Sequence, residues 1–269
     1  MKSGRDSTRR NRNIGTAKRG HGQNNRLVIP TRYYPTLAFY FENLRNYKSL
    51  SRDIDGLQIT FLVKETRSGS YHACTIDDIA HLLHFVPKPD LMGIELIVLR
   101  QPKRKEEVLN SAWGRWVPYV VIDDYRGSAV FLEAVDITHP MRWTKSLMPD
   151  AQKELERLQE DGHTVTLTKR HHLIWLSLES VRSTQLYRTL LHEIGHHVDY
   201  TRDPDGYEKK NAGEKEVFAH RYADELGEKL RKRRVIPFER KLSLERLKED
   251  RLRACDFDLA AAGSGGAIR

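Results

Sequence analysis

The chain has 269 residues, of which 39% are hydrophobic and 31% are charged, and its formal net charge is +9. This length and apolar content allow one large domain or two small ones with a real core. No stretch approaches the roughly 18–20 consecutive apolar residues of a membrane span, and two distant cysteines, Cys74 and Cys255, do not indicate a disulfide framework. The composition therefore argues against membrane proteins and disulfide-rich secreted proteins, and favours a reducing compartment.

Most of the positive charge lies in residues 1–26, where eight basic side chains face one acid, Asp6. This stretch is rich in Gly, Asn, Ser and Thr, so we expect a disordered basic tail. Such a tail can weakly bind nucleic acid or an acidic partner, or it can simply be a solubilising terminus. No hydrophobic segment follows the first charges, which argues against a standard secretory signal and favours the cytoplasm, although non-standard secretion stays open.

Residues 27–149 predict the N-terminal α+β part of one compact unit. A helix is expected at Leu37–Arg45, where aromatic residues leave a strand open, and a second at Thr75–His84. His81 and His84 in the second helix are read as ordinary helix residues. Pro118 favours an edge strand. The predicted strands are Leu57–Val63, Ile94–Leu99, Val117–Ile122 and Ala129–Val135.

Residues 150–255 predict a second part of the same unit, followed by a disordered tail at 256–269. His171 and His172, next to a loop, are read as structural. A final charged helix is expected at Leu242–Leu252. Before it the pattern predicts a helix at Asp150–Glu160, strands at Thr164–Thr168 and His172–Ser177, and a helix from a Ser183 cap to Tyr200.

The helix after Ser183 carries two histidines four residues apart, His192 and His196. They lie one turn from each other, so both imidazoles can bind one metal ion. Glu193 lies beside them, and in this H-E-x-x-H pattern a Glu takes a proton from a zinc-polarised water. The opposite face repeats an apolar residue every four positions, which predicts packing against a core. Gly195 costs roughly 1 kcal/mol of helix stability relative to Ala and suits a second backbone passing close by. The alternative is a solvated helix with two chance histidines.

A catalytic zinc takes three protein ligands and leaves a fourth position for water. Asn211 and Glu214 form a capping-box pattern that starts a second helix, and Glu216 lies at the edge of its apolar face. We therefore predict Glu216 as the third ligand. An exposed Glu in a charge-rich helix is the alternative, and Asp203 or Asp205 in the preceding turn can replace it as ligand.

The stretch from His192 to Asp199, together with Glu216-Val-Phe-Ala-His-Arg-Tyr-Ala223, resembles the two-helix active site of gluzincin-type zincin metallopeptidases. It is similar in particular to the anthrax lethal factor-like catalytic domain and to ImmA/IrrE-type metallopeptidases. The resemblance covers residues 186–230 and implies an α+β zincin-like fold with a small mixed sheet. It also implies Zn²⁺ on His192, His196 and Glu216, with Glu193 as general base.

Three further residues are assigned only by this resemblance. Asp199 matches a position that can orient a ligand imidazole. Tyr207 precedes Glu216 by nine residues, as in thermolysin-like enzymes, and is a candidate donor to the oxyanion, the alternative being a surface loop tyrosine. His220 stands where related enzymes often carry a polar or acidic residue, so it either supports a metal ligand or is merely a polar residue one turn past Glu216.

We therefore expect a zinc metalloendopeptidase that hydrolyses a protein or peptide substrate with a metal-activated water. By resemblance, the substrate would lie along an edge strand such as Val117–Ile122. The alternative is a regulatory or nucleic-acid-binding protein with a basic tail and a structural or inactive zincin-like core. A toxin-like protease acting on host protein follows from the lethal factor-like resemblance alone. A fourth protein ligand on the metal would favour the structural alternative.

Overall fold

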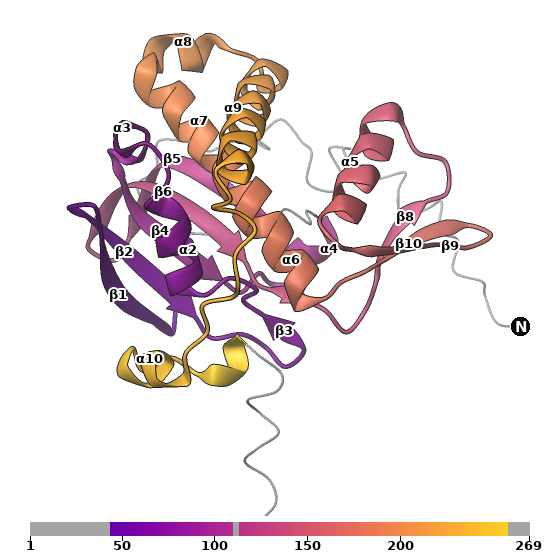
Figure 1. The fold of residues 1–269 in the computed structure, drawn as a ribbon, viewed down its shortest axis with the longest axis horizontal. Helices are drawn as coiled ribbons and strands as arrows, with labels where there is room; N and C mark the ends of the chain where they lie inside the picture. Colours follow the sequence, from indigo (N-terminus) through magenta and orange to yellow (C-terminus); the bar gives the residue numbers. More distant parts are fainter. Residues whose placement is uncertain (1–43, 110–112, 258–269) are drawn as a thin grey trace, which may run out of the picture. The chain divides into compact units, whose positions relative to one another are not determined.

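A five-stranded mixed sheet forms the centre of the part of the chain that the computed structural model describes, residues 44–109 and 113–257 (Figure 1). Its order is β1-β2-β4-β6-β5. The inner strands β2, β4 and β6 run parallel, while β1 and β5 pair antiparallel at the two edges. The strands are β1 (Tyr47–Ile54), β2 (Leu57–Lys64), β4 (Ile94–Arg100), β5 (Gly114–Ile122) and β6 (Tyr125–Glu133). With the helices below, this makes an α+β structure, as predicted.

The sequence predicts every strand of this sheet except β1, with ends that differ by a few residues. β1 mixes polar and charged residues with few apolar ones and is largely exposed at the sheet edge, so it lacks a clear apolar pattern. Pro118 lies in edge strand β5, as predicted. The pairing of β5 with β6 shifts register between Val117 and Val120, a local irregularity that accommodates a residue without an N–H.

Alternate residues of the sheet enter two different cores, as the period of two in a strand requires. Phe61, Ile97 and Leu132 belong to the larger core, which also contains the apolar faces of the helices. Leu62, Val98 and Phe131 belong to a smaller core on the other face. The central strand β4 is buried on nearly its whole length, which explains its continuous apolar run.

A second, three-stranded antiparallel sheet has the order β8-β10-β9. Helix α5 packs on this sheet, with Leu155 and Leu158 of α5 against Ile174 in a separate small core. These elements are β8 (Met141–Thr144), α5 (Pro149–Glu160), β9 (Thr164–Leu167) and β10 (His171–Trp175), with the two-residue pair β3 (Ser70–Tyr71) and β7 (Val135–Asp136) elsewhere. The sequence predicts helix α5 and strands β9 and β10 in these places, but not β8.

The helix that carries the histidine pair begins earlier than predicted. Ser177, not Ser183, is its N-cap, and its hydroxyl accepts a hydrogen bond from the Ser180 N–H at 3.1 Å. No helix-breaking residue separates the two serines, so the helix extends to the first one. The segment runs as α6 (Leu178–Thr184), the π-helical η1 (Gln185–Thr189) and α7 (Leu190–Arg202).

The other predicted caps are confirmed, but the predicted turn at residues 201–206 is wrong. Thr75 caps α2 (Ile76–Leu83), and Asn211 caps α9 (Ala212–Lys232) with Glu214 completing a capping box. Between α7 and α9, Asp203 accepts from the Gly206 N–H at 3.0 Å and caps a short helix, α8 (Pro204–Lys209). The remaining helices are α3 (Lys88–Leu91), α4 (Arg104–Leu109), α10 (Leu244–Glu249) and η2 (Ala254–Asp256).

The predicted ends of the chain lie mostly outside the described residues. This holds for the basic tail at 1–26, for nearly all of the helix expected at Leu37–Arg45, and for most of the tail expected at 256–269. Leu44 and Arg45 are described and are not helical. Phe257 is fully buried in the larger core, so the folded part extends beyond residue 255. Across the described ranges, no helix is long and apolar enough to cross a membrane.

Candidate metal centre

Helices α7 and α9 lie side by side, and their close approach is possible because residue 195 is glycine (Figure 1). A Cβ atom added to Gly195 would lie 2.9 Å from the Ala219 Cα and 3.0 Å from the Ala219 oxygen. This confirms the expectation that a second backbone passes close to Gly195. The contact sets α9 directly beside the turn that carries both histidines of the motif.

Three ligand-type side chains meet at this contact. The Nε2 atoms of His192 and His196 lie 3.1 Å apart. The carboxylate of Glu216 reaches both of them, with Oε2 at 3.1 Å from the His192 Nε2 and Oε1 at 3.5 Å from the His196 Nε2. The side chain of Glu216 is 54% exposed, so it faces the imidazoles from the solvent side of α9. The three residues predicted as ligands are thus brought together.

This arrangement fits a divalent cation of zinc size. Ligand atoms placed about 2.0–2.1 Å from a tetrahedral zinc lie roughly 3.3 Å from one another. The separations of 3.1, 3.1 and 3.5 Å lie close to that value, although the two histidines approach different oxygens of Glu216. Hydrogen bonds from His192 and His196 hold the pKa of Glu216 below its ordinary value, which keeps the carboxylate ionised. Two imidazoles and one carboxylate therefore form a plausible N₂O donor set for zinc.

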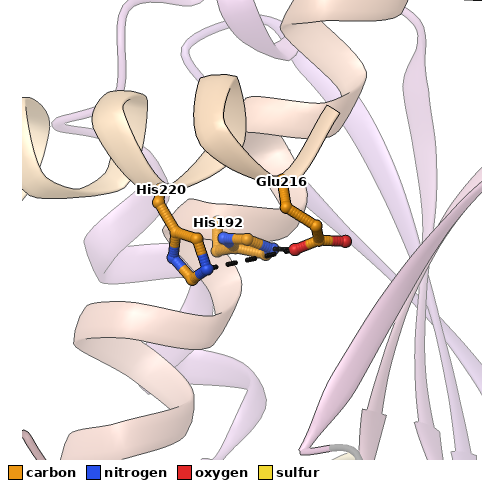
Figure 2. A group of neighbouring side chains, drawn as sticks. All are labelled: His192, Glu216 and His220. Atoms are coloured by element: carbon orange, nitrogen blue, oxygen red, sulfur yellow. Dashed lines mark ion pairs between the residues drawn. The ribbon is translucent and has the colours of Figure 1, made fainter. Parts of the chain in front are cut away.

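His220 adds a second, looser triad to the same centre (Figure 2). The candidate ligand atoms of His192, Glu216 and His220 all lie within 4.8 Å of one another. The His220 Nε2 is 4.0 Å from Glu216 Oε2, and its ring centroid is 4.4 Å from that of His192. We take the triad with His196 as the metal site because its atoms are closer together and its imidazoles are more buried.

Glu193 lies next to the triad in a buried position on α7 and is 8% exposed. Its Oε2 accepts a hydrogen bond of 2.6 Å from the backbone N–H of Trp116 in edge strand β5. Burial raises the pKa of Glu193, and the neighbouring histidines oppose that rise. The carboxylate is thus held in place by the sheet edge. This strand contact was not predicted.

Comparisons with models of protein families, with curated proteins and with solved structures found no match for this chain. The resemblance to zincins therefore rests on the site residues and their spacing.

Tyr207 is not a surface loop residue. It lies on α8, is 9% exposed, and packs edge-on against Trp116 and Tyr200 at centroid distances of 5.9 and 5.5 Å. Burial, together with the charges of Asp199, Glu216 and Glu193, raises the pKa of Tyr207 to about 12. Its hydroxyl therefore stays protonated at neutral pH and can donate a hydrogen bond.

Asp199 does not orient an imidazole in this structure. Its Oδ1 instead accepts from Lys210 Nζ at 2.6 Å, just before the cap of α9. In the described part of the chain, the buried Nδ1 atoms of His192 and His196 have no hydrogen-bond partner. The sequence could not indicate the Lys210 contact, because it depends on the path of α8.

The alternative ligand candidates lie outside the triads. Asp203 is engaged as the cap of α8, and no ion pair joins it or Asp205 to His192 or His196 among the described residues, whereas Glu216 is paired with both histidines. His84 pairs with Asp55 at 2.9 Å, and His81 packs on Phe238. These two histidines thus have structural contacts.

Proposed function

We propose that this chain is a zinc-dependent metallopeptidase of zincin type that hydrolyses peptide bonds in a protein or peptide. The observation that carries the proposal is the convergence of His192, His196 and Glu216 beside the buried carboxylate of Glu193. A zinc ion held by this triad would polarise a water molecule and the carbonyl of the substrate. The other steps are assigned to side chains of the chain itself.

Glu193 is proposed as the general base and acid. Oε2 is fixed by the Trp116 N–H at 2.6 Å, so Oε1 can take a proton from the attacking water and pass it to the leaving amine. Burial raises the pKa of Glu193 above its ordinary value, which suits a carboxyl that both accepts and returns a proton. The Tyr207 hydroxyl, kept protonated by its raised pKa, is proposed to donate to the developing oxyanion.

Strand β5 is proposed to bind the substrate backbone. It is an edge strand of the five-stranded sheet, and one of its N–H groups bonds the proposed general base. An extended peptide added to this edge would pass next to Glu193. Main-chain pairing of this kind binds the backbone of an extended segment whatever its sequence. This is compatible with cleavage within a peptide chain. Any preference for particular side chains would come from nearby surfaces.

The test is digestion of casein by the full chain loaded with zinc, before and after removal of the metal with a chelator. We expect cleavage that stops with the chelator and returns with zinc. Glu193→Gln should lower the rate by about 10²–10⁴-fold because it removes proton transfer, and it should keep its zinc. Glu208→Gln, an exposed acid on α8, is the matched control and should cleave normally. Full activity in Glu193→Gln would refute this mechanism.

A further inference from the structure

Among the described residues, His220 is the imidazole that pairs with Glu216 but has no part in the proposed mechanism. It lies one turn after Glu216 on α9, and its side chain is 50% exposed. Figure 2 shows His192, Glu216 and His220 grouped together, with an ion pair from each imidazole to the same carboxylate. The imidazole of His220 is thus a further nitrogen donor beside the three proposed ligands, His192, His196 and Glu216.

The position of His220 is close to, but not at, coordinating distance. Its Nε2 is 4.0 Å from Glu216 Oε2, whereas ligands of one zinc lie roughly 3.3 Å apart. The ligand atoms of His220 and His192 lie within 4.8 Å of each other. A shift of about 1–2 Å towards His192 and Glu216 would therefore bring the imidazole into the ligand shell, a movement that side-chain rotation can supply. The backbone of α9 need not move, because Glu216 on the same helix already faces the site.

We propose that His220 is a fourth, reversible ligand of the metal, which closes the position used by water and substrate until a substrate displaces it. This inference rests on the proposed function, because it assumes a metal on His192, His196 and Glu216. It goes beyond that function by giving the resting site a protein ligand that must leave before hydrolysis.

The contrast in burial explains why this ligand would be reversible. The side chains of His192 and His196 are 14% and 11% exposed and project from α7, whose other face is packed in the larger core. Their burial restricts the rotamer changes that would carry them out of the site. His220 stands on the solvent side, and exposed side chains change rotamer on the picosecond to nanosecond timescale. Its ring also rests against the His192 ring at 4.4 Å, which keeps it near the site when unbound.

The test counts the imidazoles on the metal directly. The full chain is loaded with Co²⁺ in place of zinc, and proton NMR is used to count the strongly shifted, exchangeable N–H signals, one for each coordinated imidazole. We expect three signals for the unmodified chain. His220→Phe keeps a ring against His192 but has no nitrogen, so it should give two signals and weaken zinc binding about tenfold. His139→Phe, at an exposed histidine remote in sequence, is the control and should give three.

Acetohydroxamate, a small chelating ligand for the open metal position, completes the experiment. Added to the Co²⁺-loaded chain, it should reduce three signals to two by displacing His220. Two signals in the unmodified chain without this ligand would overturn the inference while leaving the proposed metal site intact. Three signals that persist with it would show a permanent fourth ligand and also overturn it. The absence of any shifted signal would instead refute the metal site on which the proposed function depends.

Discussion

Buried histidines occur in two settings in this protein. In the first setting, one ring nitrogen bonds an oxygen atom of another part of the chain. His72 Nε2 lies 2.7 Å from the Lys64 oxygen, and His163 Nε2 lies 2.9 Å from Thr184 Oγ1. Burial lowers the pKa of both imidazoles. Such histidines join elements of the fold and need no ligand to explain them.

In the second setting, the ring nitrogens face one another and a shared carboxylate. His192 and His196 direct their Nε2 atoms to a point beside Glu216 rather than to a backbone or hydroxyl oxygen. Burial alone does not separate the two settings, and neither does an unpaired Nδ1, which occurs in both among the described residues. The partner of Nε2 separates them, because in the second setting this atom lies beside other ligand-type atoms.

His196 and His197, which are adjacent on α7, allow the test of this comparison with the largest expected effect. His197 belongs to the first setting, because its Nε2 lies 2.9 Å from the Met92 oxygen. His196→Asn should lower zinc affinity by at least about 100-fold. Mutating a residue that only hydrogen-bonds to a metal ligand already lowers metal affinity about 10–100-fold. His197→Asn should keep zinc and lower the free energy of unfolding by about 1–3 kcal/mol. Zinc titration calorimetry and urea unfolding measure the two effects, and equal zinc affinities would break the comparison.

The helix contact that creates the second setting can be tested at two glycines. Gly195→Ala should lower the free energy of unfolding by about 1–3 kcal/mol, because its Cβ would meet Ala219 backbone atoms at 2.9 and 3.0 Å. Gly227→Ala on α9 would meet only the flexible Arg231 side chain at 3.5 Å, so it should instead gain about 0.5–1 kcal/mol. Urea unfolding of both variants decides the matter. A stabilised Gly195→Ala would mean that the helices are not so closely packed.

The first setting also predicts a pH dependence of stability. Burial lowers the pKa of His163 to about 4, below the value near 6.5 expected in the unfolded chain. The unfolded state therefore binds a proton first as the pH falls, and the free energy of unfolding should drop between pH 6.5 and pH 4. The His163 share should be about 1–2 kcal/mol between pH 7 and pH 5. His163→Gln should show a shallower slope in urea unfolding across this range, and an unchanged slope would contradict the assignment.

Features that depend on neighbours in the sequence could be predicted. The cap at Asn211, the apolar stripe of α7 and the close approach at Gly195 all follow from local spacing and side-chain size. Glu216 was found because it lies beside an apolar face on the helix after the motif. The proximity of His220 to Glu216 also follows from a spacing of four on one helix.

Features that depend on how distant segments meet could not be predicted. The hydrogen bond from Trp116 to Glu193 requires β5 to be the edge strand beside α7, and sequence spacing does not fix that order. The contact between Asp199 and Lys210 requires the extra helix α8, whose Pro and Gly residues are typical of a turn. The burial of Tyr207 follows from the same helix.

Zinc titration of Glu216→Ala tests the central claim most directly, because Glu216 is the proposed ligand on α9, whereas the two proposed histidine ligands lie on α7. The unmodified chain should bind one zinc ion, and Glu216→Ala should bind it at least about 100-fold more weakly. Mutating a residue that only hydrogen-bonds to a metal ligand already lowers metal affinity about 10–100-fold. Glu225→Ala, at an exposed acid of the same helix, should bind zinc like the unmodified chain. Equal zinc affinities in Glu216→Ala and the unmodified chain would contradict the proposed metal site.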